Sequence, residues 1–173
     1  MKKLLTISIL LIPELIFSGM PEQKNELSSL IVDLTRQEKQ IILDQKNYNK
    51  VIEFIKGHEG YRAYPYVCPG GFWTVGYGCI IKYSGKLNFP LSEQQATKLL
   101  KQRFDQCINL AKKHFEFDTY NKYLAVSHLI YAVGIGRVLR EQLIKDNILD
   151  VQKLKSLKYS KNREFEIQLF YDK

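Results

Sequence analysis

Residues 55–78 of this chain read IKGHEGYRAYPYVCPGGFWTVGYG, and this stretch decides the fold. It begins at the end of a helix, because apolar residues recur on one helical face as far as Ile55, and Gly60 suits the left-handed conformation that follows a helix. The residues from Tyr61 to Ile81 are rich in aromatic and β-branched side chains and are interrupted by Pro-Gly-Gly at 69–71. The stretch therefore predicts a helix, starting near Asn47, that leads into a β-hairpin.

The rest of the chain reads as helical. Ser92 to Gln95 has the spacing of a capping box and opens a helix. The residues from Tyr123 to Val133 are apolar nearly all round, which predicts a helix buried on every side and ended by Gly134. Three shorter amphipathic segments follow, at 138–146, 149–157 and 162–171. The predicted fold class is α+β, with a small β-hairpin lobe, a predominantly helical lobe and a cleft between them.

Length and charge limit the possible functions. The 173 residues have room for one compact domain and an appendage, which excludes a multidomain enzyme. There are 26 Lys and Arg against 18 Asp and Glu, and the net charge of +8 favours an anionic partner. Nucleic acid, a membrane surface and an acidic polymer all satisfy that condition.

The N-terminus favours export. Two lysines precede an apolar run from Leu4 to Ile12, and the whole segment is too short for a spanning helix. We interpret residues 1–18 as a signal peptide, either cleaved or retained as a signal anchor, and expect a periplasmic or secreted protein. Contact with the membrane is expected through this segment only. Export makes the cell envelope a better partner than nucleic acid, and we expect no nucleic-acid partner.

Residues 19–46 form a second region, predicted to be an amphipathic helical extension of a domain at 47–173. Leu27, Leu30, Ile31 and Leu34 have the spacing of one helical face. The simplest interpretation is a helix packed on the domain. A partner-binding or membrane-surface helix is the alternative.

The chain has three cysteines, Cys68, Cys79 and Cys107, and their odd number leaves at least one thiol unpaired within an exported chain. No CxxC pair is present, and the three histidines do not complete a zinc-binding pattern. We therefore expect no metal and no cofactor. His58, His114 and His128 are interpreted as structural.

Glu59 is the first candidate for chemistry. It shares the apolar face of Ile52 and Ile55 and lies at the carboxyl end of its helix, where the helix dipole is negative. Both conditions favour the protonated acid, which is the form that donates a proton to a leaving glycosidic oxygen. The alternative is a solvated glutamate at a frayed helix end.

The hairpin supplies the other candidates. Cys68 and Thr74 flank its turn, where a thiol and a hydroxyl can hold a water molecule. Tyr66, Phe72 and Tyr77 offer ring faces on which a sugar can stack. The alternative is that the aromatic rings belong to the core and that Cys68 is a small buried apolar residue.

These residues resemble a known signature. The segments Ile55–Arg62 and Gly71–Gly78 look like those of the phage-type lysozymes, or endolysins, of glycoside hydrolase family 24. In that family eight residues separate a Glu from an Asp or Cys, and five more separate the latter from a Thr. Glu59, Cys68 and Thr74 fit both gaps.

The resemblance continues to Tyr171. Leu91–Ala96 is similar to the family's helix after the hairpin, and Ala125–Gly134 to its buried helix. Arg163, Glu166 and the pair Leu169-Phe170 look like its closing helix. The chain departs from the pattern at Ala132, where Asn is common, and at Asn162, which replaces the first of a frequent Arg pair.

The resemblance implies hydrolysis of the β-1,4 bond between N-acetylmuramic acid and N-acetylglucosamine in peptidoglycan. Glu59 would be the general acid, and Cys68 and Thr74 would position the attacking water. It also implies a hypothesis of regulation, in which Cys68 forms a disulfide with Cys79 or Cys107 and blocks the site; three reduced thiols are the alternative. We expect a monomer.

Three other functions remain open at the level of sequence. The first is a non-catalytic peptidoglycan-binding or effector protein on a lysozyme scaffold. The second is a lytic transglycosylase, in which a hydroxyl of the sugar replaces water as the nucleophile. The third is a basic nucleic-acid-binding module, which the export signal disfavours.

Overall fold

The computed structural model describes residues 21–81, 87–157 and 160–172. The signal peptide predicted over residues 1–18 lies outside these ranges. The chain divides into two compact units, residues 1–45 and residues 46–173. The candidate site residues named above all belong to the second unit.

A single helix, α2 (Pro21–Glu59), replaces the two helices predicted before Gly60. The prediction that a separate helix begins near Asn47 is therefore wrong. The segment 44–50 contains neither Gly nor Pro, so nothing in it interrupts the helical hydrogen-bond pattern. Gly60 ends the helix with φ +68°, and its N–H donates to the Lys56 carbonyl at 3.2 Å. The predicted end of the helix is thus confirmed.

In the first unit, the predicted helical character of residues 21–45 is present. Five of its apolar side chains are more than half exposed: Leu30, Val32, Leu34, Ile41 and Ile42. The packing of this segment on the domain stays a prediction. None of the helices that the structure describes is both long enough and apolar enough to cross a membrane.

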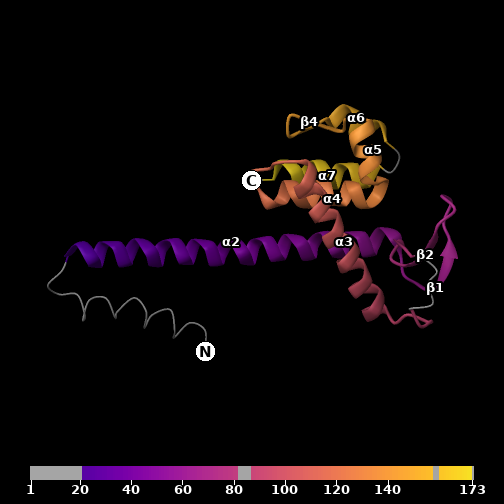
Figure 1. Cartoon of the computed structure of the whole chain (residues 1–173), viewed down its shortest axis with the longest axis horizontal. Coiled ribbons are helices and arrows are strands. Elements are labelled where there is room, and N and C mark those ends of the chain that lie inside the picture. The colour runs from indigo at the N-terminus through magenta and orange to yellow at the C-terminus, as the bar shows by residue number, and fades with distance from the viewer. Residues whose placement is uncertain (1–20, 82–86, 158–159, 173) are drawn as a thin grey trace. The chain divides into compact units, whose positions relative to one another are not determined.

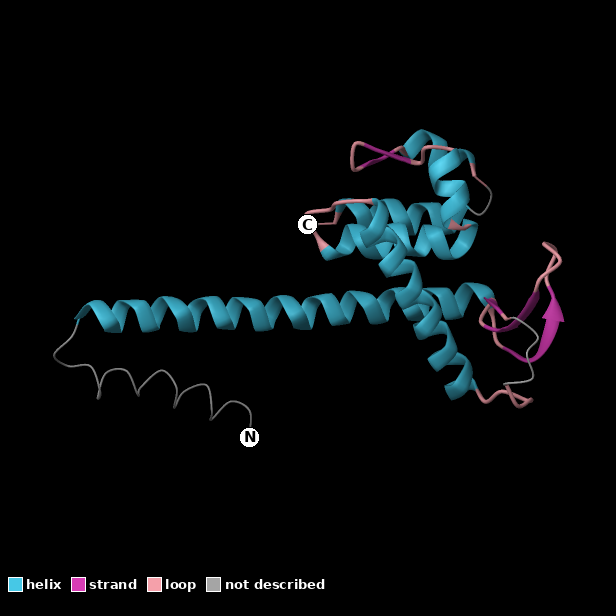
Figure 2. Ribbon diagram, viewed as in Figure 1, coloured by secondary structure: helices cyan, strands magenta, loops and turns pink. Residues whose placement is uncertain are grey.

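The predicted hairpin is present and gains a third strand (Figure 2). The strands β1 (Arg62–Val67), β2 (Trp73–Gly76) and β3 (Cys79–Ile80) form an antiparallel sheet in the order β1-β2-β3. Tyr66 lies opposite Thr74 in the first pair, and Thr74 lies opposite Ile80 in the second. The register places Thr74 in the middle of the sheet.

Two long helices follow the sheet. The helix α3 (Glu93–His114) begins at the predicted capping box, in which the Ser92 hydroxyl accepts from the Gln95 N–H while the Gln95 side chain accepts from the Ser92 N–H. The helix α4 (Tyr120–Val133) ends at the predicted Gly134, which has φ +80°. Burial on every side is confirmed from Leu124 to Ile130 but not at the end of the predicted range, where Tyr131 and Val133 are half-buried and Ala132 is exposed. In Figure 1, α7 (Ser160–Tyr171) lies along α4.

The region after α4 is only partly helical, which corrects the prediction for 138–146. The short helix α5 (Ile135–Arg140) is followed by a two-stranded hairpin, β4 (Ile144–Lys145) and β5 (Ile148–Leu149). Asp146 and Asn147 form its turn with φ of 51° and 59°, which these two residue types tolerate better than most. Asp150 then caps α6 (Val151–Ser156) by accepting from the Lys153 N–H.

The second unit has one apolar core. The end of α2 contributes Val51, Ile52 and Ile55, and α3 and α4 contribute most of the rest. Cys79 and Tyr77 join the core from the end of the sheet. The fold is therefore α+β, a small sheet beside a larger group of helices, as predicted.

Candidate active site

Glu59 is the last residue of α2, and its carboxyl group packs against the turn after β2. A Cβ atom placed on Gly78 would lie 2.8 Å from Glu59 Oε2 and 3.2 Å from Cδ. Gly78 also has φ +78°, which side chains other than glycine rarely adopt. The absence of a side chain at Gly78 thus creates the space that the Glu59 carboxyl occupies.

Glu59 as a whole is exposed, but loss of solvent around its carboxyl, which packs against Gly78, raises the pKa of Glu59 above its ordinary value. Two positive neighbours oppose this effect, first His128 and then His58. The direction agrees with the sequence argument that this carboxyl is held in the acid form. An acid with a raised pKa remains a proton donor closer to neutral pH than an ordinary glutamate.

Cys68 and Thr74 are neighbours across the hairpin. The Cys68 N–H donates to the Phe72 carbonyl at 2.9 Å, and the Gly71 N–H donates back to the Cys68 carbonyl at 2.8 Å, which closes the loop between β1 and β2. Thr74 is 2% exposed, and the single proton of its hydroxyl can be donated either to the Phe72 carbonyl, at 3.0 Å, or to the Cys68 sulfur. The Cys68 side chain is half-buried at the mouth of this loop.

The three thiols differ in their electrostatics. Hydrogen bonds to the Cys68 sulfur, first from the Phe72 backbone and then from the Thr74 hydroxyl, lower the pKa of the Cys68 thiol. Burial raises the pKa of Cys79, and it raises the pKa of Cys107 to about 11. Cys68 is therefore the thiol that is best placed to ionise. All three cysteines are free thiols, and the disulfide hypothesis stays a prediction.

The aromatic candidates divide into two groups. Phe72 is 56% exposed, and Tyr66 is half-buried with the Arg62 guanidinium 4.2 Å from its ring centre. Tyr77 is 2% exposed, and its hydroxyl donates to Glu93 Oε1 at 2.7 Å. The Tyr77 ring belongs to the core, which corrects its assignment to sugar stacking, because a buried ring offers no face to a ligand.

The strand β2 connects the two halves of the site. Thr74 lies on this strand beside Cys68, and Gly78, two residues beyond its end, receives the Glu59 carboxyl. The structure thus brings Cys68 and Thr74 into direct contact and fixes Glu59 at the other end of the same short segment. The strand β2 and the turn after it therefore connect the candidate water-binding pair with the residue that packs against the candidate acid.

Sequence reasoning missed Tyr131 of α4. Its hydroxyl donates to the Tyr77 carbonyl at 2.5 Å and lies 3.6 Å from Cys79 Sγ, so it holds the turn on both sides of Gly78. Burial and the nearby Cys79 raise the pKa of Tyr131 well above its ordinary value, which keeps it neutral. The apolar pattern of α4 concealed this role, because a tyrosine counts as a core residue in such a pattern.

Sequence reasoning also missed the partner of His128. Its Nδ1 lies 2.7 Å from Glu166 Oε1, and both side chains are buried. The two residues lie on α4 and α7, so only the tertiary structure reveals the pair. No group of His, Cys, Asp and Glu within the described ranges has an arrangement that would hold a metal ion.

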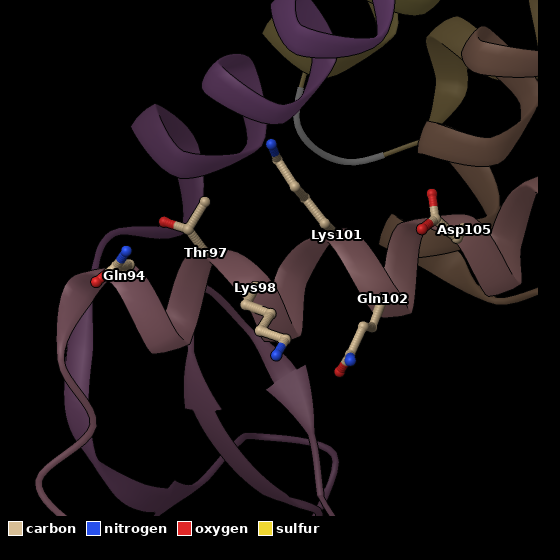
Figure 3. Close-up of a pocket in the computed structure, with 6 residues that line it drawn as sticks. All are labelled: Gln94, Thr97, Lys98, Lys101, Gln102 and Asp105. Atoms are coloured by element: carbon tan, nitrogen blue, oxygen red, sulfur yellow. The ribbon is translucent and has the colours of Figure 1, made fainter.

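Two hollows lie along α3. One, of about 410 Å³, is lined by Gln94, Thr97, Lys98, Lys101, Gln102 and Asp105. Figure 3 shows Lys98 and Lys101 extending to different sides of the helix, away from one another. The other, of about 360 Å³, shares Lys98 and Gln102 and extends to Leu87 and Leu91. Neither hollow is lined by Glu59, Cys68 or Thr74.

Comparison with known proteins places the chain in a family. The family model described as phage lysozyme matches residues 56–161, and the chain belongs to that family. An endolysin of Acyrthosiphon pisum secondary endosymbiont phage 1 is 29% identical over 99 residues, which are 56% of this chain and 65% of that endolysin. The match therefore spans just under two thirds of this relative.

Solved structures share the fold. The muramidase domain of SpmX from Asticaccaulis excentricus has a TM-score of 0.52 at 20% identity, and the match covers 72% of this chain and 96% of that domain. The endolysin from Escherichia coli O157:H7 phage FAHEc1 has the same TM-score and identity, with 71% and 91% covered. At this identity the likeness concerns the architecture alone.

Proposed function

We propose that this protein is a peptidoglycan hydrolase, a muramidase that cleaves the β-1,4 bond between N-acetylmuramic acid and N-acetylglucosamine. Membership of the phage lysozyme family supports the reaction class. The observation that carries the proposal is the Glu59 carboxyl at the end of α2, which packs against Gly78 and has a raised pKa. Gly78 follows the strand β2, which carries Thr74 beside Cys68.

In the proposed reaction the Glu59 carboxyl gives its proton to the glycosidic oxygen as the bond to the anomeric carbon breaks. A water molecule held by the Cys68 sulfur and the Thr74 hydroxyl attacks that carbon and loses a proton to the thiolate or to solvent. The products are two sugar chains, one with a new reducing end. Solvent returns a proton to Glu59.

Cys68 lies at the position where the lysozyme signature has Asp or Cys, and an Asp carboxylate there would supply a negative charge. The hydrogen bonds that lower its pKa favour the thiolate, so the sulfur carries part of the charge that an ionised aspartate would carry. Phe72, exposed beside this pair, and Tyr66 are the proposed sugar-contacting rings. We propose further that the protein acts as an exported monomer, and its net charge of +8 supports attraction to an anionic cell wall.

The decisive experiment digests purified peptidoglycan with the full chain and identifies the muropeptides by mass spectrometry in H₂¹⁸O. We expect products with reducing-end muramic acid that carry one ¹⁸O atom. Glu59→Gln should lower the rate by at least about 100-fold, because it removes the general acid. Glu116→Gln, the same substitution at an exposed position, should leave the rate unchanged.

Other outcomes would replace the proposal. Anhydromuramic products without ¹⁸O would indicate a lytic transglycosylase. Binding to peptidoglycan without products, with and without reductant, would indicate the non-catalytic binding protein. Products only in the presence of reductant would support both the muramidase and the disulfide hypothesis for Cys68.

A further inference from the structure

Three charged or titratable side chains that the proposed reaction does not use are buried together. His128 on α4 is 2% exposed, and Arg163 and Glu166 on α7 are each 1% exposed. Burying such groups costs free energy unless they compensate one another. Their arrangement therefore needs an explanation beyond the packing of an apolar core.

The three side chains form a chain of contacts. Arg163 Nη1 lies 3.0 Å from Glu166 Oε2, and Glu166 Oε1 lies 2.7 Å from His128 Nδ1. Within the described part of the chain the Arg163 guanidinium has no hydrogen-bond partner, and the ion pair with Glu166 compensates its charge. Beside an arginine, the Glu166 carboxylate can only accept, and His128 Nδ1–H is then the donor. The contact fixes both the tautomer and the orientation of the imidazole.

Aromatic rings connect this chain to the helix that carries Glu59. Phe54 on α2 stacks on Phe165 with 3.8 Å between ring centres and meets the His128 ring edge-on at 5.4 Å. Phe54 also stacks on His58, the residue before Glu59, at 4.4 Å. The last turns of α2 are thus packed directly against His128 and the residue next to Glu166.

A second route joins His128 to the Glu59 carboxyl. His128 and Tyr131 are three positions apart on α4 and so share one side of that helix. Tyr131 contacts both residues that flank Gly78, and the Glu59 carboxyl packs against Gly78 itself. His128 is also the strongest positive influence on Glu59.

We propose that His128, held in one orientation by Glu166 and Arg163, is a positioning residue for Glu59 and sets the pH at which this acid gives up its proton. Among the residues that the structure describes, the titratable groups that interact with Glu59 are His58 on its own helix, His128 and Tyr131 on α4, and Cys79 on β3. Arg163 in turn faces Glu166 and Arg137. The inference rests on the proposed function of Glu59.

The sign of the effect follows from the charges. A positive imidazole near a carboxylate lowers the pKa of the acid, and His128 does so here against the effect of burial. His128→Gln removes that positive charge, so Glu59 should keep its proton to higher pH. Glu166→Gln removes the carboxylate that supports the imidazolium and should act in the same direction.

The first test titrates the Glu59 carboxyl by ¹³C NMR in the full chain, with Glu59→Gln to assign the signal. We expect His128→Gln to raise its titration midpoint by at least about 0.3 pH unit, a shift within the range of nearby-charge effects. His114→Gln, the same change at an exposed histidine at the end of α3, should not move it. This readout needs no hydrolysis, so it is independent of the proposed function.

The second test measures the rate of peptidoglycan hydrolysis against pH. The alkaline limb, where the acid loses its proton, should move upwards in His128→Gln and in Glu166→Gln, and the double variant should show no additional shift. Unchanged midpoints in folded variants would overturn the proposal. The wild type provides a check where a variant does not fold. ¹⁵N NMR should show protons on both ring nitrogens of His128 at the pH of activity, and a neutral imidazole with one unprotonated nitrogen would overturn the proposal.

Discussion

At the scale of a single residue, the lack of a side chain at Gly78 determines where the Glu59 carboxyl can lie. Its φ is +78°, and a Cβ atom at this position would lie only 2.8 Å from Glu59 Oε2, so there is no room for a side chain. Gly134 is a natural reference, because its φ is +80° and no heavy atom lies within 4 Å of the corresponding position. Comparing alanine variants at these two positions therefore distinguishes the effect of backbone strain from the effect of displacing the Glu59 carboxyl.

We predict that Gly78→Ala lowers the rate of hydrolysis by about 100-fold, because a small displacement of a catalytic group has effects of that order. Gly134→Ala should cost about 1 to 3 kcal/mol of folding free energy, because φ +80° with ψ 146° is a conformation that only glycine adopts readily, and should have little effect on the rate. Steady-state kinetics with urea denaturation of both variants would check this. Equal losses of activity in the two variants would contradict it.

Cys68 allows a prediction of pH dependence. If the thiolate is the form that supports the attacking water, the rate should fall on the acid side as the sulfur takes up a proton. An aspartate has an ordinary pKa near 3.9, far below the ordinary pKa of about 8.5 of a thiol. Cys68→Asp should therefore keep activity and extend the acid limb to lower pH.

The matched variant for this prediction is Cys68→Ala, which should lose about 100-fold in rate at the pH of maximal activity, because nothing replaces the charge, and should lose the acid limb that Cys68 ionisation causes. The measurement is kcat/KM against pH for the three proteins. An acid limb that stays at the same pH in Cys68→Asp would show that Cys68 ionisation does not control the rate.

At the scale of secondary structure, the sequence predicted elements whose signals are local. The capping box at Ser92, the apolar surface of α4 and the hairpin around Pro69 each depend on a few neighbouring residues, and each is confirmed. The start of a helix at Asn47 was wrong, because a change in apolar pattern is not a break in the backbone.

The hairpin β4–β5 was not predicted because its local signal is too short. Its strands have two residues each, too few for an alternating pattern to appear, and only Asp146-Asn147 marked the turn. The candidate site shows the same limit. Glu59, Cys68 and Thr74 are found by their spacing along one segment, whereas Gly78, Tyr131 and the pair His128–Glu166 act through contacts between elements that no local pattern encodes.

At the scale of the whole molecule, the second unit contains its own core. The apolar cluster from Val51 to Phe170 draws on α2, the sheet and the later helices, all within residues 46–173. The buried part of α2 begins near Tyr48, whose hydroxyl donates to Asp105 at 2.8 Å. The elements that hold Glu59 therefore all belong to this unit.

We predict that a fragment of residues 46–173 folds cooperatively, with a circular dichroism spectrum and a single unfolding transition typical of a packed domain. It should retain the pH profile of hydrolysis of the full chain, because the groups that face Glu59 are all included. A fragment that binds hydrophobic dyes and melts without a transition would contradict this prediction.

The position of Glu59 at the end of α2 also restricts how the protein can evolve. Each residue added to a helix turns all that follows by about 100° and advances it by about 1.5 Å. Val51, Ile52 and Ile55 anchor the helix in the core just upstream of the acid. One inserted or deleted codon between Ile55 and Glu59 would move the Glu59 carboxyl away from Gly78. Descendants of this gene can vary there by substitution, while changes of length are confined to other parts of the chain.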